Sequence, residues 1–511
     1  MKSRNWTVVS GTTTEATEDG SIMRRALPLL TGLGLGALML GPALRPGYVL
    51  SYDMVFVPHP AITDPMFGRT GGFPRQVPSD AFAALLSAIP WSQQLILLSI
   101  FAIAATGAAR LVPDVTLARI AAAVVAVWNP YVAERLLLGQ WALLLGYAGL
   151  PWVLGAIVRR APLPRLALAF VPAAIGGFAA MNLTALVAAG ALIAVRGRGL
   201  VRTAAVLTVL ALPWLVPALR ASGTATDPAG VGVFAARPDT PLSTLGSLLS
   251  LGGIWNTEAV PPGYSALLPA LLRLGLCLTA LTALAVQRTP TARGALYAGT
   301  AGLALACVGI SAPGRSALGW AISHWAGFGV LRDGQLFIGA LALGAALGAG
   351  HLAAGWPRRA WYVIIAPVAL LPMLAWGVFG QLGSVGYPRD WLAAQKLINA
   401  DPAPGKALSL PWGAYRRPDW NDGRAVINPI PRMLSRRVVW NDGLQVGRVE
   451  LAREDPLAIE ADALLKAPGD PSEAFRAAGY RYVVIADGTT ENRFLSGKVV
   501  LRAPTITVIL L

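Results

Sequence analysis

A single carboxylate stands out in an apolar part of the chain. The segment SYDMVFVPHP, residues 51–60, places Asp53 between Tyr52 and Met54, just after the first long apolar run. A carboxylate beside apolar neighbours is partly desolvated, which raises its proton affinity and suits it to act as a base. An aspartate that caps a helix or forms a turn is the plain alternative. Asp53 is therefore a candidate general base, with Tyr52 and His59 as candidate substrate contacts.

Two further segments place charges inside apolar surroundings. The segment NPYVAERLLLGQW, residues 129–141, carries Glu134 beside Arg135 and then Gln140. Such charges are costly unless they are paired or solvated, and they tend to be functional. A Glu–Arg pair with a purely structural role is the alternative.

The segment GVLRDGQLF, residues 329–337, holds Arg332 and Asp333. Arginine suits bidentate recognition of phosphate, and its charge does not titrate away. Arg273 lies in another apolar run and supplies a further cation, unless it extends toward the membrane surface. The candidate phosphate-binding residues are therefore Arg332, Arg135 and Arg273. The candidate substrate contacts are Tyr52, His59, Glu134, Gln140, Asp333, Gln335 and Trp255.

The composition is that of a polytopic membrane protein. Of 511 residues, 55% are hydrophobic and 13% are charged, and the mean hydropathy is +0.56. This profile excludes an ordinary soluble globule. The net charge of +16 is explained by the Lys and Arg that orient a membrane protein, so we expect no nucleic-acid partner.

Cysteine and histidine offer no metal framework. Both cysteines, Cys277 and Cys307, fall in apolar runs, and the chain has three histidines. Buried cysteines of this kind serve packing. We therefore expect no metal-ligating residues of these types. A divalent cation held by Asp53 with another outer acid is left open, because hard cations prefer oxygen ligands.

The apolar runs predict about eleven membrane-spanning helices of about 20 residues each. They begin near residues 26, 93, 116, 141, 166, 181, 201, 264, 294, 335 and 360. Arginines fall in alternate short loops, which the positive-inside rule assigns to the cytoplasm. An odd number of spans then places the C-terminus outside the cell membrane. Residues 1–23 should form a disordered cytoplasmic tail, and residues 24–380 the transmembrane domain.

The predicted outer loops are unequal in length. Residues 46–92 and 221–262 are long and rich in Pro, Gly and aromatic side chains. The stretches DAFAALLSAIP and LSTLGSLLSL within them are too short to span and read as interfacial helices. We expect these loops to cover a cavity on the outer face.

The character of the chain changes after residue 380. Residues 381–511 hold 17 basic and 14 acidic side chains, which predicts a soluble extracytoplasmic domain. The runs KALSLPW, RRVVW, YRYVVIAD and TITVILL read as strands between helix-compatible segments, so a small α/β module is expected. Trp-Asn-Asp occurs at 420–422 and 440–442. These triplets are turns, or they contact glycan through Trp420 and Trp440.

Taken together, these features resemble the C-type (GT-C) glycosyltransferase superfamily. The resemblance rests on the carboxylate of the first outer loop, on NPY..ERL..GQW, on RDGQ.F and on the outer C-terminal domain. It covers roughly residues 24–511 and is most similar to uncharacterised YfhO-like actinobacterial members. Many members carry an acidic pair in the first outer loop, whereas Asp53 stands alone.

The resemblance implies an activity. Such enzymes transfer a sugar from a polyprenyl-phosphate donor, with inversion, to a glycan or lipid acceptor of the cell envelope on the outer face. Asp53 would be the general base, the arginines would hold the donor phosphate, and the C-terminal domain would hold the growing glycan. Two other functions fit the same residues: transport of a lipid-linked glycan, and an inactive scaffold that binds glycan. A transporter should show internal repeats, and the sequence has no clear repeat.

Overall fold

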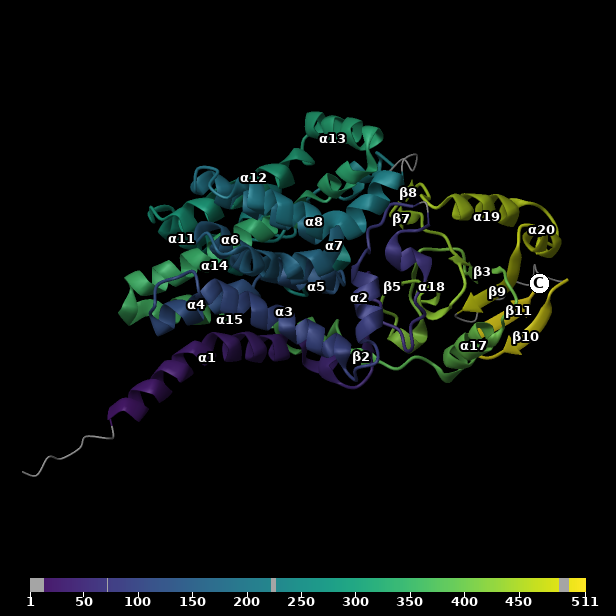
Figure 1. The fold of residues 1–511 in the computed structure, drawn as a ribbon, viewed down its shortest axis with the longest axis horizontal. Coiled ribbons are helices and arrows are strands. Elements are labelled where there is room, and N and C mark those ends of the chain that lie inside the picture. The colour runs from purple at the N-terminus through teal and green to yellow at the C-terminus, as the bar shows by residue number, and fades with distance from the viewer. Residues whose placement is uncertain (1–12, 71, 222–226, 487–495) are drawn as a thin grey trace, which may run out of the picture.

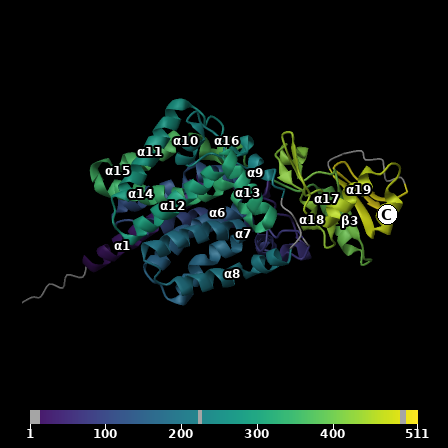
Figure 2. The ribbon, with the colours of Figure 1, turned by 90° about the horizontal axis from the view of Figure 1, so that it is seen from above.

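The computed structural model describes residues 13–70, 72–221, 227–486 and 496–511. Helices make up one end and the centre of the elongated molecule, and the strands of the C-terminal region lie at the other end (Figure 1). The same division is visible from above (Figure 2). The start of α1 (Thr13–Leu40) and the C-terminal sheet are therefore at opposite ends of the long axis.

In the part of the chain that the structure describes, eight helices are long and apolar enough to cross a membrane. Two bent helix pairs raise the number to ten if each pair counts as one span. The single spans are Ala26–Leu44, Ser92–Ala109, Thr116–Leu137, Trp141–Val158, Leu163–Ala194, Leu200–Arg220, Leu267–Ala285 and Gly334–Gly355. The bent pairs are Pro290–Val308 with Ala312–His324, at 94°, and Pro357–Leu370 with Pro372–Gly380, at 63°. The chain is thus a multi-pass membrane protein, with a count near the expected eleven.

The difference in count comes from α7 (Leu163–Ala194), which contains the two expected starts near 166 and 181. Its backbone leaves the helical region at Gly177, where φ is 74° and ψ is −147°. Both halves of α7 lie along α6 (Trp141–Val158) but run in opposite directions. In the first half, Pro172 lies beside Gly149 and Gly176 beside Ala142, so the chain runs antiparallel to α6. In the second half, Ala180 lies beside Gly146, and Ala191 and Leu154 both lie beside Gly294, so the chain runs parallel to α6. α7 is therefore a helical hairpin whose two legs correspond to the two expected starts.

One expectation for the N-terminus is wrong. Residues 13–23 were expected to be disordered, but α1 begins at Thr13. This segment contains no proline, so backbone hydrogen bonding continues beyond the apolar run. Residues 1–12, the rest of the expected tail, lie outside the described residues.

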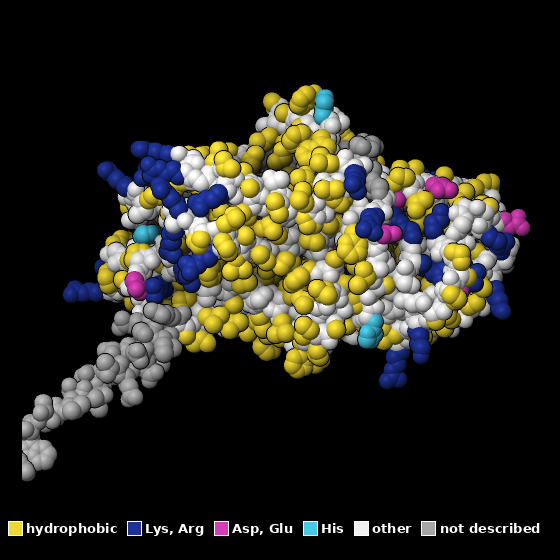
Figure 3. Space-filling view, viewed as in Figure 1, with side chains coloured by type: hydrophobic (Ala, Val, Ile, Leu, Met, Phe, Trp, Pro, Cys, Tyr) yellow, Lys and Arg dark blue, Asp and Glu magenta, His cyan; other side chains and the backbone are white. Residues whose placement is uncertain are grey.

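The surface divides into three zones along the long axis. Figure 3 shows hydrophobic side chains over the central helices and a concentration of Lys and Arg at the end where α1 begins. Basic and acidic side chains are mixed at the opposite end, over the C-terminal region. An apolar belt between two polar ends matches a bilayer crossing.

The C-terminal region contains a five-stranded mixed sheet. Its strands are β3 (Lys406–Leu410), β6 (Val438–Val439), β9 (Tyr480–Ala486), β10 (Lys498–Arg502) and β11 (Ile506–Leu510). The order is β10-β11-β9-β3-β6, with β3 parallel to β6 and β9, and β11 antiparallel to β9 and β10. The helices are α17 (Arg389–Ala400), α18 (Ile430–Met433), α19 (Pro456–Lys466) and α20 (Ser472–Ala477). The four expected strands are β3, β6, β9 and β11, so the α/β expectation is confirmed.

The first predicted outer loop, residues 46–92, packs into this C-terminal region. Its strand β1 (Tyr48–Val49) pairs with β2 (Ser384–Val385). Leu50, Val55 and Val57 of the loop are buried in one hydrophobic cluster with C-terminal residues such as Trp391. The short helices α2 (Ser79–Leu86) and α10 (Ser243–Leu249) occur where interfacial helices were expected.

We predict that Gly177→Ala destabilises the protein. At this φ an alanine is strained by about 1–3 kcal/mol, and its Cβ would lie 2.3 Å from the carbonyl oxygen of Val77. The apparent unfolding temperature in detergent, followed by tryptophan fluorescence, should fall clearly. Gly275→Ala in α11 (Leu267–Ala285) is the control, because no atom lies within 4 Å of its added Cβ. Equal unfolding temperatures for both variants would contradict the hairpin turn at Gly177.

Candidate functional site

Asp53 lies at the corner of a tight turn. Met54 N donates to Ser51 O at 2.8 Å and Ser51 N donates to Met54 O at 3.3 Å, which leaves Tyr52 and Asp53 at the tip. Tyr52 adopts a left-handed φ of 44°, an uncommon conformation for a non-glycine residue. Asp53 is thus a turn residue, as the plain alternative states, but its carboxylate faces polar partners.

The turn is docked on the connection between α5 (Pro130–Leu137) and α6. Asp53 N donates to Leu138 O at 3.1 Å, and Ser51 Oγ donates to Leu137 O at 2.6 Å. Gly139 adopts a φ of 72°, and a Cβ there would lie 2.0 Å from Ser51 O. A glycine is therefore required at this place in the GQW motif, because any side chain would displace the turn that carries Asp53.

The Asp53 carboxylate has two hydrogen-bond partners. The Tyr415 hydroxyl donates to Oδ1 at 2.5 Å, and the Gln140 side chain is the second partner. Burial raises the pKa of Asp53, while these two hydrogen bonds and the nearby charge of Arg432 oppose the rise. The half-buried carboxylate therefore has the raised proton affinity that the sequence predicts.

Arg135 is the centre of the polar network. Its guanidinium is fully buried and donates to both carboxylate oxygens of Asp333, at 2.6 and 2.9 Å. It also donates to Gln140 Oε1 at 2.7 Å and to Gln335 Oε1. The two charged motifs of the sequence are therefore partners. These acceptors occupy the fully buried Arg135 guanidinium, so its expected contact with phosphate stays a prediction, and its observed partners are side chains of the protein.

Glu134 and Gln335 are fully buried behind this pair. Gln335 Nε2 donates to Glu134 Oε2 at 3.1 Å and to Gly252 O at 3.3 Å. Asp239, which the sequence analysis did not single out, lies beside Glu134 and accepts a hydrogen bond from Gly253 N. Both side chains thus have interior partners, and the substrate contacts expected of Glu134 and Gln335 stay predictions.

Arg273 has a similar interior position. Its side chain is 5% exposed, and Nη2 donates to Tyr264 O at 2.7 Å. The guanidinium carbon lies 4.1 Å from the centre of the Tyr264 ring, a cation–π contact. Arg273 therefore ties its helix to the second outer loop, and its burial argues against a direct phosphate contact.

Arg332 differs from the other two arginines. Its guanidinium stacks on Phe234, 4.5 Å from the ring centre, and Phe234 packs edge-on against Trp255 at 4.7 Å. Among the residues that the structure describes, none forms a hydrogen bond or ion pair with the Arg332 side chain. Burial and the charge of Arg75 lower the pKa of Arg332 to about 10. A largely buried guanidinium without an ion-pair partner among the described residues would be stabilised by a bound anion.

A second wall of the site joins three segments of the chain. The Tyr52 hydroxyl and the Arg417 guanidinium both donate to Glu258 Oε2. Tyr52 comes from the first outer loop, Glu258 from the second and Arg417 from the C-terminal region. These hydrogen bonds lower the pKa of Glu258, so this wall presents an ionised carboxylate.

Three candidate residues lie outside this network. The His59 imidazole is exposed, and no described residue of the site contacts it. Trp420 is half-buried against Tyr387 and Trp391, at ring distances of 5.1 and 5.2 Å. The Trp420 ring packs on these two aromatic rings, and its expected contact with glycan stays a prediction. Trp440 is also half-buried.

Both Trp-Asn-Asp triplets form turns. Asn421 donates to Arg424 O at 3.0 Å and is followed by Asp422 at a left-handed φ of 52°. Asn441 Oδ1 accepts from Gly443 N at 2.9 Å. The Asn441 contact is that of an Asx turn, and the left-handed Asp422 ends a short helical turn at the first triplet, so the turn interpretation is favoured over sugar binding.

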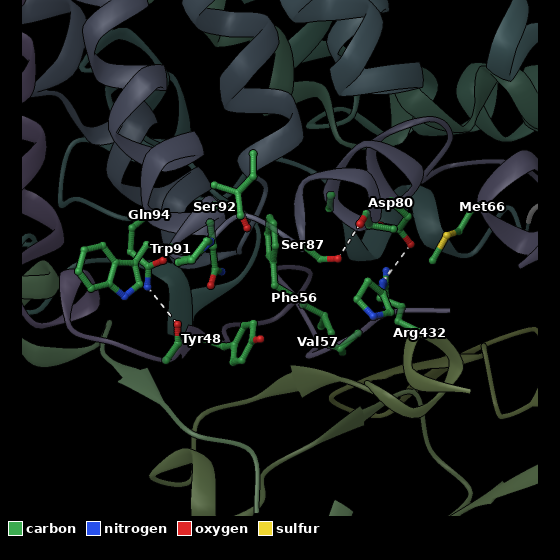
Figure 4. Close-up of a pocket in the computed structure, with 18 residues that line it drawn as sticks. Tyr48, Phe56, Val57, Met66, Asp80, Ser87, Trp91, Ser92, Gln94 and Arg432 are labelled. Atoms are coloured by element: carbon green, nitrogen blue, oxygen red, sulfur yellow. Dashed lines mark hydrogen bonds and ion pairs between the residues drawn. The ribbon is translucent and has the colours of Figure 1, made fainter. Parts of the chain in front are cut away.

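A cavity of about 170 Å³ lies beside the site, between the first outer loop, the start of α3 (Ser92–Ala109) and Arg432 (Figure 4). Arg432 and Asp80 face each other on one side, with Nε to Oδ2 at 2.9 Å. Trp91 lies on the other side and is 64% exposed. The cavity thus has a charged side near Asp53 and an aromatic side toward the surface.

The residues that sequence reasoning missed are those that reach the site from distant parts of the chain. They are Tyr415, Arg417, Arg432 and Asp239. Tyr415 and Arg417 carry a weak signal, because alternate side chains of a strand share a face. In the described part of the chain, no group of three or more His, Cys, Asp or Glu residues could hold a metal ion.

We predict that Arg135→Met and Arg332→Met differ strongly in stability. Removing Arg135 leaves the partly buried Asp333 carboxylate without its ion-pair partner, which costs about 3–5 kcal/mol. Removing Arg332 breaks no ion pair with a described residue and should change the free energy of unfolding little. Thermal unfolding of both variants in detergent measures the difference. Equal losses would show that Arg135 does not hold the network together.

No protein-family model matches the chain, and no curated protein matches its sequence. Solved structures do match. The cryo-EM structure of the arabinofuranosyltransferase AftD from Mycobacteria has a TM-score of 0.58 and 15% identity, and the match covers 95% of this chain and 39% of AftD. The chain thus spans about two fifths of the length of AftD.

Two crystal structures of ArnT from Cupriavidus metallidurans also match, each with a TM-score of 0.45. The apo structure is 14% identical over 97% of this chain and 98% of ArnT. The structure bound to undecaprenyl phosphate is 13% identical over 96% of this chain and 98% of ArnT. These scores are below the range that establishes a shared fold. The match to AftD shows a shared fold over 95% of this chain, which agrees with the fold expected from the sequence.

Proposed function

We propose that the chain is a membrane glycosyltransferase that moves a sugar from a polyprenyl-phosphate donor to a glycan or lipid acceptor of the cell envelope. The observation that carries the proposal is the half-buried Asp53 carboxylate, whose pKa is raised and which is held by Tyr415 and Gln140. Arg332 supports it as a cation that has no ion-pair partner among the described residues. The fold neighbour AftD is itself named as a glycosyltransferase, although fold alone does not determine function.

The reaction uses Asp53 as the base. Asp53 accepts the proton of an acceptor hydroxyl while the hydroxyl oxygen bonds to the anomeric carbon of the donor. The bond from that carbon to the phosphate oxygen breaks, and the phosphate leaves with the electron pair. Attack from the opposite side inverts the anomeric configuration. A base in hydrogen-bonding reach contributes about 10²- to 10⁴-fold.

The leaving phosphate needs a fixed cation, because negative charge grows on it. Arg332 is the best candidate, since Arg135 is occupied by Asp333 and Arg273 is buried against Tyr264. Phe234 and Trp255 lie beside Arg332. Aromatic rings next to a cation suit a sugar phosphate, because the rings cover apolar sugar faces.

The orientation follows from the charge asymmetry. Lys and Arg gather at the end where α1 begins, and the site lies toward the end with the C-terminal sheet (Figures 1 and 3). By the positive-inside rule, the α1 end is cytoplasmic, and the site and residues 381–511 are extracytoplasmic. The exposed Trp91 and Leu85, near the cavity, then lie at the membrane surface. A polyprenyl tail stays in the lipid there while its phosphate reaches the site.

Asp53→Asn tests the base. Wild-type protein and variant, in lipid nanodiscs, are incubated with radiolabelled polyprenyl-phosphate sugars and a cell-envelope acceptor extract. We expect transfer to fall by about 10²- to 10⁴-fold, because an amide cannot accept the proton, while donor binding is retained. Asp64→Asn in the same loop is the control, since Asp64 is exposed. Equal transfer by all three proteins would remove Asp53 from this role, and binding without transfer by any of them would favour the transporter or scaffold.

Arg332→Met tests the phosphate contact. We expect donor binding to weaken by about 10- to 100-fold, because a charge-assisted hydrogen bond to phosphate is lost. Dissociation constants for polyprenyl-phosphate sugar in nanodiscs measure the effect. Arg69→Met is the control. Arg69 is another arginine of a predicted outer loop, and its side chain is 73% exposed. Unchanged donor affinity in Arg332→Met would place the phosphate elsewhere.

A further inference from the structure

The C-terminal region reaches the site through a short hairpin. Strands β4 (Tyr415–Arg416) and β5 (Val426–Ile427) are antiparallel, with Tyr415 opposite Ile427. The Asp53 turn adds to the edge of this hairpin. Tyr52 N donates to Ala425 O at 2.6 Å, and Ile427 N donates to Tyr52 O at 2.9 Å. Backbone pairing therefore sets the position of the hairpin relative to the turn.

This pairing also decides which side chains face the site. Alternate residues of a strand point to opposite faces. The Arg416 side chain turns into the C-terminal region, where Nη2 donates to Ser409 Oγ at 2.8 Å. Tyr415 and Arg417 point the other way, toward Asp53 and Glu258. The hairpin thus presents two side chains to two carboxylates of the site.

In the hydrogen bond between Tyr415 and Asp53, the roles of donor and acceptor are fixed. An ionised carboxylate only accepts hydrogen bonds, so the Tyr415 hydroxyl is the donor. Burial and the facing carboxylate raise the pKa of Tyr415 well above its usual value, so the hydroxyl keeps its proton. The Tyr415 ring also packs on Tyr52, with ring centres 5.8 Å apart. The direction of the hydroxyl is therefore held by the ring as well as by the hairpin.

We propose that Tyr415 is a positioning residue for Asp53, so that the C-terminal region completes the catalytic site. This inference rests on the proposed function. Tyr415 and Gln140 occupy two of the roughly four lone-pair directions of the carboxylate, and they fix its plane. The remaining directions are left for the acceptor hydroxyl. The C-terminal region then orients the Asp53 carboxylate through Tyr415, in addition to any role in holding the glycan.

The pH profile of transfer tests this role with Tyr415→Phe, which removes only the hydroxyl. Transfer requires ionised Asp53, so kcat/KM rises with pH through the pKa of Asp53. The Tyr415 hydrogen bond stabilises the ionised form, and its loss raises that pKa. We expect the rising limb to move to higher pH by about one unit, with activity recovered at alkaline pH. A merely structural defect would lower transfer at every pH.

Tyr482→Phe is the matched control. Tyr482 also donates to an aspartate, Asp401 Oδ2, at 2.6 Å, within the C-terminal region but away from Asp53. Its profile should coincide with that of the wild type. A Tyr415→Phe profile that coincides with both would overturn the inference.

A double-mutant cycle separates this inference from the proposed function. Thermal unfolding is compared for Asp53→Asn, Tyr415→Phe and the double variant, at a pH where Asp53 is ionised. We expect the loss caused by Tyr415→Phe to be smaller in the Asp53→Asn background, because a hydrogen bond to a charged acceptor is the stronger one. If the wild type transfers no sugar, the proposed function fails while the cycle still reports the contact. Strictly additive losses would then overturn the role of Tyr415 as well.

Discussion

The buried guanidinium of Arg135 is the contact on which the site depends. A charge without access to water is tolerated only when it is paired and hydrogen-bonded. Arg135 meets this condition through Asp333, Gln140 and Gln335. Arg135 lies at the end of one membrane span, and its partners lie at the starts of two others. The same ion pair therefore holds three helix ends together and fixes the amide that contacts Asp53.

The position of Asp53 follows from this frame. Arg135 donates a hydrogen bond to Gln140. The adjacent Gly139 has no side chain, which lets the Asp53 turn pack directly on the connection between α5 and α6. The other side of the turn is a strand of the C-terminal hairpin. Asp53 thus sits where the transmembrane part and the C-terminal region meet, with a carboxylate partly withdrawn from water. A general base needs both a fixed position and a raised pKa. The transmembrane part and the C-terminal region together fix the position of Asp53 and bury it, which raises its pKa.

Much of the architecture could be predicted because it depends on local patterns. Long apolar runs gave the spans, including the two legs of α7, and alternating apolar residues gave β3, β6, β9 and β11. The charged motifs gave the right set of residues for the network, since buried charges require partners. Their roles could not be read from the chain. Whether an arginine is occupied or available depends on which carboxylate faces it, and Arg135 and Asp333 are far apart in sequence.

The errors have the same origin. Tyr415 was missed because it reaches Asp53 across 362 residues of sequence. Trp420 was expected at the surface because a turn motif follows it, yet its ring packs on Tyr387 and Trp391. Glu134 was expected at the substrate, and its hydrogen bond with Gln335, 201 residues away in sequence, was not foreseen. Each of these depends on a long-range contact that no local pattern records.

The most direct test of the account is a cryo-EM structure of the Asp53→Asn protein in nanodiscs with a bound polyprenyl-phosphate sugar. We expect the phosphate to contact the Arg332 guanidinium and the anomeric carbon to face residue 53, with the lipid tail leaving toward the membrane surface. A donor whose phosphate lies away from Arg332, and whose sugar is out of reach of residue 53, would contradict it.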